Sequence, residues 1–304
     1  MPSTRKTMTA AEFNACIHPL QRARFALALI FTLLLAPVMV GLAGVFFYLV
    51  PVVVFVIWFA GRVLFARFLG NSILVSSVNY PRINAISEEV KATLGYGKPV
   101  FIFVYEQGSF NAYMKKFFTR RAIFLNSELL EAGVTDDEVR WLVGRFVGYL
   151  CARKGFWGWL IRVAEYFFIF NLFLLPYERA LVYTGDRLAL AVIGGDISSA
   201  ISAMQKLMVG RQLGYSVNPE GIVEQHRQVK GSFFAFMARL ASFFPHVTAR
   251  YVDLIVFAKS AFPAPYGKFA AANPGLPPDI ARLAPAATGP VVAGGAVPSP
   301  YLAR

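Results

Sequence analysis

The uncharged stretch from Phe25 to Gly61 limits what this chain can fold into more than any other segment. It is long enough for two membrane-spanning helices, each of which needs roughly 20 apolar residues. Pro37 and the glycine-containing segment 41–44 interrupt the run near its middle. We therefore predict a transmembrane helical hairpin over 25–61, with helices at about 25–42 and 45–61. One long kinked helix is the alternative, whereas a cleaved signal peptide would have a shorter apolar run.

Basic residues flank both outer ends of this apolar run. They are Arg5, Lys6, Arg22 and Arg24 before it, and Arg62 and Arg67 after it. Because basic residues mark the cytoplasmic side, we expect both hairpin ends and the main domain to be cytoplasmic, as in a protein of the bacterial inner membrane. The chain has 30 lysines and arginines against 17 acidic residues, which also favours anionic membrane lipid as a partner. No basic run is interleaved with stacking aromatic residues, so we expect no nucleic-acid partner.

The two ends of the chain differ in composition from its middle. Residues 1–24 form a basic segment with a short helix, in which Thr9 and Glu12 have the spacing of a capping box. Residues 260–304 are rich in Pro, Ala and Gly, which predicts a disordered or extended tail. Such a tail is either a linker or a segment that lies along a partner or in the protein's own groove. The intervening residues 62–259 predict one domain.

Periodicity predicts that this domain is mainly α-helical with a small β-sheet. The expected helices lie at 82–94, 136–153, 178–193, 196–209, 218–244 and 246–259, and the expected strands at 100–104 and 121–125. The two strands are close enough in sequence to be neighbours in one sheet. Residues 156–175 are apolar and aromatic but also contain Arg162 and Glu165. We interpret them as an interfacial or re-entrant helix, with a third membrane span as the alternative.

The helix at 136–153 has clear signals at both ends and along one face. Thr135 and Glu138 form a capping box, and Arg153 lies where the helix dipole favours positive charge. Its apolar stripe consists of Val139, Leu142, Val143, Phe146, Val147 and Leu150. We therefore expect this helix to lie in the core, with the segment 144–149 at its centre.

Five segments of the chain share the order and spacing of motifs in a known family. They are Asn111-Ala112-Tyr113, Ala122 to Leu130, Thr135 to Tyr149, Arg179 to Arg187 and Ser242 to Arg250. They resemble the HtpX-like integral-membrane zinc metallopeptidases, a gluzincin family that also includes the CAAX prenyl endopeptidases. The resemblance covers about residues 25–258 and implies an α+β zincin-like domain on the membrane hairpin. In such a domain one helix with the motif His-Glu-x-x-His supplies two zinc ligands and the catalytic glutamate, and a later helix supplies a third ligand.

The residues that would carry this chemistry depart from the family motif. Arg145 and Tyr149 stand at the two histidine positions, and Phe146 stands at the catalytic glutamate. Val182 and Phe244 stand at the third ligand and at a late histidine. The surrounding positions that match the family are Asn111, Gly148, Arg179, Tyr183, Asp186 and Arg187. The resemblance therefore implies a metallopeptidase frame with no catalytic residue and no zinc, although zinc is the family's cofactor.

No other part of the sequence replaces the lost site. His18, His226 and His246 lie in three separate regions, and none has another histidine or a carboxylate three or four residues away. Cys16 and Cys151 are far apart, so we expect reduced structural thiols rather than a disulfide or a zinc site. Cys151 has no neighbouring histidine in sequence to activate it.

The resemblance also predicts what takes the place of zinc. In the family, the aspartate equivalent to Asp186 orients the first histidine ligand. Asp186 should therefore lie near Arg145, whose guanidinium would pair with it and supply the positive charge that zinc supplied. An Arg145 that points to solvent is the alternative. Tyr149 is expected to need a hydrogen-bond partner. The former metal pocket should be apolar, because it would be lined by Phe146, Val182 and Phe244.

Three functions are compatible with this sequence. The first is a membrane-anchored pseudoprotease that binds another membrane protein or an extended peptide by strand addition at a sheet edge. The second is an active membrane metalloendopeptidase with a non-standard site. The third is a structural subunit that acts as a scaffold in a membrane complex. We favour the first, and therefore a protein that is not an enzyme.

Overall fold

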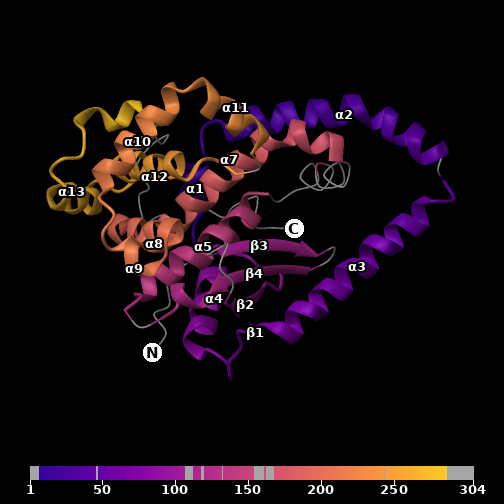
Figure 1. Cartoon of the computed structure of the whole chain (residues 1–304), viewed down its shortest axis with the longest axis horizontal. Helices are drawn as coiled ribbons and strands as arrows, with labels where there is room; N and C mark the ends of the chain where they lie inside the picture. Colours follow the sequence, from indigo (N-terminus) through magenta and orange to yellow (C-terminus); the bar gives the residue numbers. More distant parts are fainter. Residues whose placement is uncertain are drawn as a thin grey trace.

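The computed structural model describes residues 7–45, 47–106, 112–117, 120–131, 133–153, 161, 168–242 and 244–285. This part of the chain is mainly helical, with a small four-stranded sheet and two apolar helices at the N-terminus (Figure 1). In chain order the elements are α1 (Ala10–Cys16), α2 (Gln21–Val45), α3 (Val50–Asn71), β1 (Ile73–Leu74), α4 (Pro81–Thr93), β2 (Phe101–Tyr105), β3 (Ala112–Phe117), β4 (Arg120–Asn126), η1 (Ser127–Leu129), α5 (Asp136–Ala152), α7 (Phe168–Val192), α8 (Ile197–Val209), α9 (Arg211–Gly214), α10 (Pro219–Gly231), α11 (Phe233–Ala241), α12 (Val247–Ala261), α13 (Pro263–Ala272) and η2 (Pro278–Arg282).

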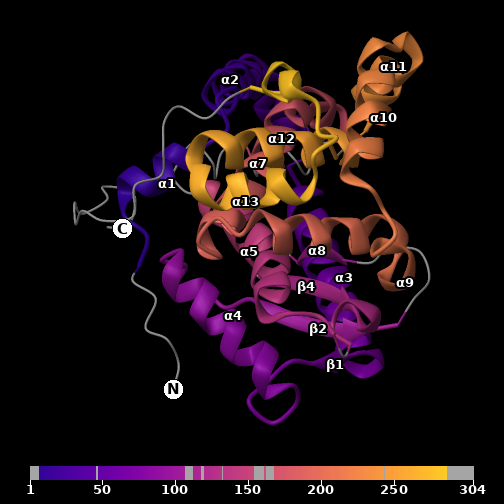
Figure 2. The ribbon, with the colours of Figure 1, turned by 90° about the vertical axis from the view of Figure 1, so that its left-hand side faces the viewer.

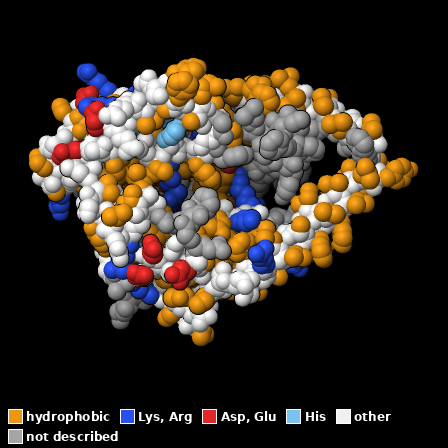
Figure 3. All heavy atoms as spheres, viewed as in Figure 1, with side chains coloured by type: hydrophobic (Ala, Val, Ile, Leu, Met, Phe, Trp, Pro, Cys, Tyr) orange, Lys and Arg blue, Asp and Glu red, His pale blue; other side chains and the backbone are white. Residues whose placement is uncertain are grey.

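The helices α2 and α3 are each long and apolar enough to cross a membrane. Most of their side chains are exposed, and Figure 3 shows hydrophobic side chains along α3 as it leaves the body of the molecule. The chain forms two helices here rather than one kinked helix, but α2 and α3 are longer than the expected helices at 25–42 and 45–61, and Pro37 lies inside α2. Apolar helices of membrane proteins tolerate an internal proline, which accounts for the helix that continues through Pro37. At its other end α3 extends to Asn71, because its last turns pack on the sheet.

The sheet has the strand order β1-β2-β4-β3. As predicted, β2 and β4 are neighbours, and they run parallel with Ile102 opposite Ile123. The strand β3 pairs antiparallel with β4 and forms one edge, and the short β1 pairs antiparallel with β2. No strand was expected between the strands at 100–104 and 121–125, whereas residues 112–117 form β3. The mixed polar sequence of β3 suits an edge strand with one side open, and for that reason it lacks the apolar run that identifies a buried strand.

Alternate residues of β2 and β4 face two different layers, as the period of two requires. Ile102 and Ile123 belong to the main core on the side of α4 and α5. Phe103 and Phe124 belong to a second, aromatic cluster on the other face, and their rings stack 5.3 Å apart. Phe65 of α3 meets the ring of Phe103 edge-on at 5.8 Å, which seats the end of α3 on this face. Figure 2 shows the layers: the sheet and α4, then α5, then α8, α12 and α13.

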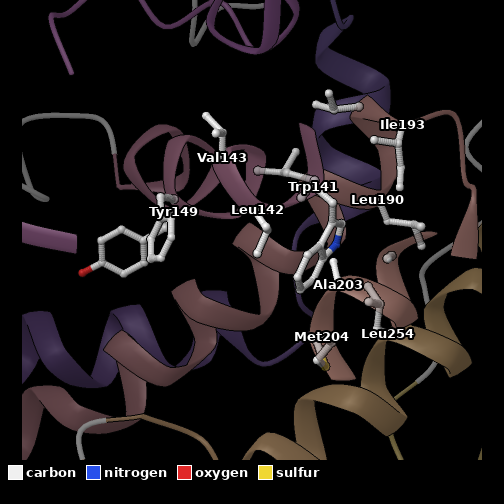
Figure 4. Close-up of a cluster of buried hydrophobic side chains, with 14 of the residues drawn as sticks. Trp141, Leu142, Val143, Tyr149, Leu190, Ile193, Ala203, Met204 and Leu254 are labelled. Carbon is white, nitrogen blue, oxygen red and sulfur yellow. The ribbon is translucent and has the colours of Figure 1, made fainter. Parts of the chain in front are cut away.

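The helix α5 lies at the centre of the main core and confirms the expected bounds to within one residue. All six residues of its predicted apolar stripe are buried, and the capping box of Thr135 and Glu138 is formed. Figure 4 shows Trp141, Leu142 and Val143 of α5 among Leu190 of α7, Met204 of α8 and Leu254 of α12. A single large core therefore holds these four helices together.

Several predicted boundaries need correction. The helix α7 begins at Phe168 and continues through Pro176, so it does not start at Glu178. The expected helix 218–244 is two helices, because Ser232 has extended backbone and caps α11 by accepting a hydrogen bond from Ala235 N. The predicted tail is structured to residue 285: α13 and η2 follow α12, and Ile280 is 1% exposed. Apolar side chains spaced among prolines, which the compositional criterion ignores, account for this difference.

Two predicted features lie wholly or largely outside the described residues. The segment 156–175 has only residue 161 and residues 168–175 described, and the latter form the first turns of α7. The predicted pair of Arg162 and Glu165 and the matching position Asn111 fall on residues that are not described.

Candidate functional site

The candidate site is formed where α5 and α7 pack unusually close together. A Cβ atom added to Gly185 of α7 would lie 2.5 Å from the carbonyl oxygen of Arg145 on α5, and one added to Gly148 would lie 3.1 Å from Gly185 O. The first distance requires glycine at position 185, and the second is tighter than ordinary van der Waals contact, which gives the matching position Gly148 a packing role. Arg145 and Tyr149 both lie at this close contact. They share one face of α5, because residues four apart in a helix lie one above the other. Asp186 comes from the facing side of α7.

Asp186 is a buried carboxylate between two guanidinium groups. Arg250 of α12 binds it through two hydrogen bonds, from Nε to Oδ2 at 2.7 Å and from Nη2 to Oδ1 at 2.8 Å. Arg145 Nε lies 3.6 Å from Asp186 Oδ1, within ion-pair range but without a hydrogen bond. The predicted neighbours Arg145 and Asp186 are thus brought together, and the Arg145 side chain does not point to solvent. The closer partner of Asp186 is Arg250, which sequence analysis did not single out.

The surroundings of Arg145 oppose its positive charge. Burial lowers the pKa of Arg145 to about 9, the positive charge of Arg250 adds to this effect, and Asp186 partly offsets it. The guanidinium carbon also lies 4.8 Å from the centre of the Phe146 ring and 5.7 Å from that of Trp141. Such contacts with aromatic faces stabilise a desolvated cation by about 0.5–2 kcal/mol each. The position that would hold the first zinc ligand therefore holds a buried cation.

Tyr149 is the centre of a second polar cluster, one helical turn further along α5. Its hydroxyl accepts hydrogen bonds from Lys116 Nζ of β3 at 2.9 Å and from Arg153 Nη1 at 3.0 Å, and donates one to Glu178 Oε2 of α7. Arg153 Nη1 also lies 3.1 Å from Glu178 Oε1. Burial, followed by the charge of Glu178, holds the pKa of Tyr149 well above its usual value. The phenol therefore stays protonated, and it has the hydrogen-bond partners that the sequence led us to expect.

A neighbouring pair of charges joins α7 to α12 and to the N-terminal segment. Arg187 binds Asp253 through two hydrogen bonds, Nε to Oδ2 at 2.9 Å and Nη2 to Oδ1 at 2.7 Å, and donates a third to Pro285 O at 3.1 Å. His18 Nε2 lies 3.5 Å from Asp253 Oδ1, and its ring stacks on Tyr183 at 4.9 Å. Tyr183 and Arg187, two positions that match the family motif, therefore connect α7 with His18 and with α12.

The remaining predicted residues divide between the site and the surface. Phe146 is buried, and Val182 is half-buried against the main core. Phe244 is 64% exposed, so the prediction that it lines the pocket is wrong. The chain leaves α11 with extended backbone at Ser242, whose carbonyl accepts hydrogen bonds from Arg179 Nε at 3.0 Å and Nη2 at 2.7 Å. This anchor fixes Ser242 on α7 and leaves Phe244 at the surface.

The site contains three residues that the family motif did not indicate: Lys116, Glu178 and Arg250. Lys116 lies in a strand that was not predicted, so its position could not be anticipated. Glu178 lies four residues before Val182 and therefore on the same face of α7. This helical spacing can be read from the sequence and would have indicated that Glu178 lies near the site. Arg250 lies three residues before Asp253, and that spacing was a further signal for one charged face of α12.

Among the described residues, no group of three or more His, Cys, Asp and Glu side chains could hold a metal ion. His18 and His226 are buried in different parts of the molecule, and His246 Nε2 lies 3.3 Å from Ala235 O. Cys16 and Cys151 are buried free thiols. Burial raises the pKa of Cys16 to about 12, so this thiol is not a nucleophile near neutral pH.

Comparison with known proteins adds no relative: no protein-family model, curated protein or solved structure matches the chain.

Proposed function

We propose that this chain is a membrane-anchored, catalytically inactive relative of the HtpX-like zinc metallopeptidases that binds an extended segment of a partner protein. The observation that carries the proposal is the contact of Arg145 with Asp186 across α5 and α7. In the family the same two positions hold a zinc ligand and the carboxylate that orients it. A cation that occupies the ligand position, beside the orienting aspartate, supports a metallopeptidase frame in which charge has replaced the metal.

The edge strand β3 offers a place for the partner. Lys116 of β3 reaches Tyr149 at the former second-histidine position, so this strand borders the altered site. On its other side β3 pairs with β4, and no strand among the described residues pairs with its remaining edge. An extended peptide could add to that edge through backbone hydrogen bonds, with alternate side chains on the face of the sheet that carries α5.

Crosslinking from the edge strand tests this proposal. A photo-reactive amino acid at Lys115 should capture a partner polypeptide in native membranes, and the same probe at Glu88, an exposed position on α4, serves as the matched control. We expect capture from position 115 and none from position 88. Equal capture from both positions, or none from either, would contradict binding at β3.

Restoring the family motif tests the frame itself. The changes Arg145→His, Phe146→Glu, Tyr149→His and Val182→Glu place the family ligands on α5 and α7. We expect the purified variant to take up about one zinc per chain, measured by elemental analysis, because such sites bind zinc with four ligands of which three come from the protein. Wild-type protein is the control. A folded variant that takes up no more zinc than wild type would overturn the proposed relationship.

A further inference from the structure

Three arginines from three different helices converge beside the start of α2. Arg24 of α2 donates from Nη1 to the carbonyl of Pro176 on α7 at 3.3 Å. Arg179, three residues later on α7, donates to Leu240 O at 2.9 Å and Ser242 O at 2.7 Å at the end of α11. Arg179 therefore lies at the end of α11 that carries Arg239, and Arg24 lies against Pro176, three residues before Arg179 on α7. The ring of Phe25 on α2 lies 5.4 Å from that of Tyr177 on α7, so these two helices pack beside each other.

Within the part of the chain that the structure describes, no carboxylate pairs with these three arginines. The charges that act on Arg179 are those of Arg239 and Arg24, together with the phenol of Tyr183, and no described carboxylate is among them. Burial, and then these two arginines, lower the pKa of Arg179. The positive charge of Arg239 also acts on Arg24, and no carboxylate among the described residues does so. Like charges held together without an acid raise the energy of the free protein, and an anion that binds between them relieves it.

The helix α11 next to these arginines has an exposed apolar surface. Phe233, Phe234 and Met237 are all largely exposed, and Phe234 is 81% exposed. Arg239, the only charged residue of α11, lies with its guanidinium 5.3 Å from the centre of the Phe236 ring. An apolar helix with a cation at one end suits the boundary between lipid headgroups and acyl chains.

We propose that Arg24, Arg179 and Arg239 bind the phosphate group of an anionic phospholipid at the base of the membrane hairpin. The apolar side chains of α11 enter the acyl region beside that lipid. Arginine forks match phosphate oxygens in two-point hydrogen bonds. A soluble phosphate compound has the same chemistry, but the position of the cluster at the first turn of α2 and beside α11 favours a lipid. The proposal rests on the membrane anchoring that forms part of the proposed function.

Two separate measurements distinguish the anchoring from the lipid site. Incorporation of the full-length chain into nanodiscs of neutral phosphatidylcholine tests the anchoring alone. Native mass spectrometry of the chain in mild detergent, with equal amounts of phosphatidylglycerol and phosphatidylcholine, then tests lipid preference. We expect wild type to retain phosphatidylglycerol, and the variant Arg24→Gln/Arg239→Gln to retain about tenfold less of it with unchanged phosphatidylcholine. Incorporation into nanodiscs without any preference for phosphatidylglycerol would overturn the lipid site and leave the anchoring intact.

Matched variants and a competitor complete the test. The variant Arg22→Gln/Arg67→Gln removes the same charge from exposed positions outside the cluster and should keep the full preference. An equal loss in this control would show general charge attraction and overturn the site. Millimolar inorganic phosphate should not displace the lipid, and complete displacement would reassign the site to a soluble phosphate compound. If the glutamine pair does not fold, Arg239→Gln alone, at an exposed position, must still lower retention, and unchanged retention would count against the proposal.

Discussion

Asp186 lies between two guanidinium groups that come from different helices, so its single negative charge is shared by two positive ones. The bond with Arg250 is direct and two-pronged, whereas Arg145 lies further away and is desolvated. Replacing a buried charge that is poorly paired costs little, because the folded protein no longer has to bury it. Removing the better partner leaves the carboxylate with only Arg145, which makes no hydrogen bond to it, and this loss costs several kcal/mol. The two arginines should therefore respond in opposite ways to the same substitution.

We expect Arg145→Met to leave the free energy of unfolding within about 1 kcal/mol of wild type, or to raise it. Arg250→Met should lower it by about 3–5 kcal/mol, because Asp186 loses its two-pronged partner. Denaturant unfolding in mild detergent measures both. A loss for Arg145→Met as large as that for Arg250→Met would show that both arginines stabilise Asp186 equally and would contradict this prediction.

The buried histidines should make the protein less stable in weak acid. Burial lowers the pKa of His18 and of His226, against smaller opposing contributions such as that of Asp253 on His18. Below a pH of about 6.5 the unfolded chain therefore binds protons that the folded chain does not, so stability falls as the pH falls. Melting temperatures at pH 7.5 and 5.5 should show this decrease.

The variant His18→Phe/His226→Phe removes both groups and should show a smaller change in melting temperature between the two pH values. The melting temperature of this variant at pH 7.5, compared with that of wild type at the same pH, shows how much the substitutions alter packing. If the acid-induced decrease remains unchanged in this variant, other groups cause it.

At the scale of elements, the contact of α5 with α7 positions the site. Gly185 lets the two backbones approach, and this approach places Arg145 beside Asp186 and Tyr149 beside Glu178. A methyl group at this position cannot be accommodated by rotating a side chain, because the nearest atom belongs to the backbone.

Gly185→Ala should therefore lower the free energy of unfolding by about 1–3 kcal/mol, as overpacking of a core does. Gly221→Ala in α10 is the matched control, because no atom lies within 4 Å of the added methyl group. That change should stabilise the helix by about 0.5–1 kcal/mol. Equal effects at the two glycines would mean that the helix contact tolerates a wider separation.

Local signals in the sequence were enough to predict some elements and not others. The capping box at Thr135 and the stripe of α5 act within one helix, so its bounds could be predicted. The edge strand β3 depends on pairing with β4, and the end of α11 depends on the anchoring of Ser242 by Arg179, which is distant in sequence. The contact of Arg145 with Asp186 is also distant in sequence, and it could be predicted only from the family motif. The contact of Arg250 with Asp186, which is shorter, was not predicted.

For the molecule as a whole, the residues after Phe262 complete the core rather than leave it. Ile280 of η2 is buried, and Arg187 donates a hydrogen bond to Pro285 O, so this segment covers the side of α12 and α7. Its Pro-, Ala- and Gly-rich composition had predicted a tail without fixed structure. A few well-placed apolar residues are sufficient to fix such a segment when their partners are preformed.

We expect Ile280→Ala to lower the free energy of unfolding by about 2–4 kcal/mol, as truncation of a buried aliphatic side chain does. Arg282→Ala, at an exposed position in the same short helix, should change it by less than about 0.5 kcal/mol. Thermal or denaturant melts of the full-length variants provide the comparison. An Ile280→Ala protein as stable as wild type would indicate that this segment does not pack in solution.

The two apolar helices are attached to different layers of the domain. Phe25 and Phe31 of α2 meet Tyr177 and Phe173 of α7 at 5.4 and 4.8 Å, while Phe65 of α3 packs on the sheet. The cluster of Lys116, Tyr149 and Glu178 connects these same two layers. In a bilayer, lateral pressure that changes the separation of α2 from α3 would act across that cluster. The two apolar helices are therefore linked to each other through the contacts of Lys116 and Glu178 with Tyr149.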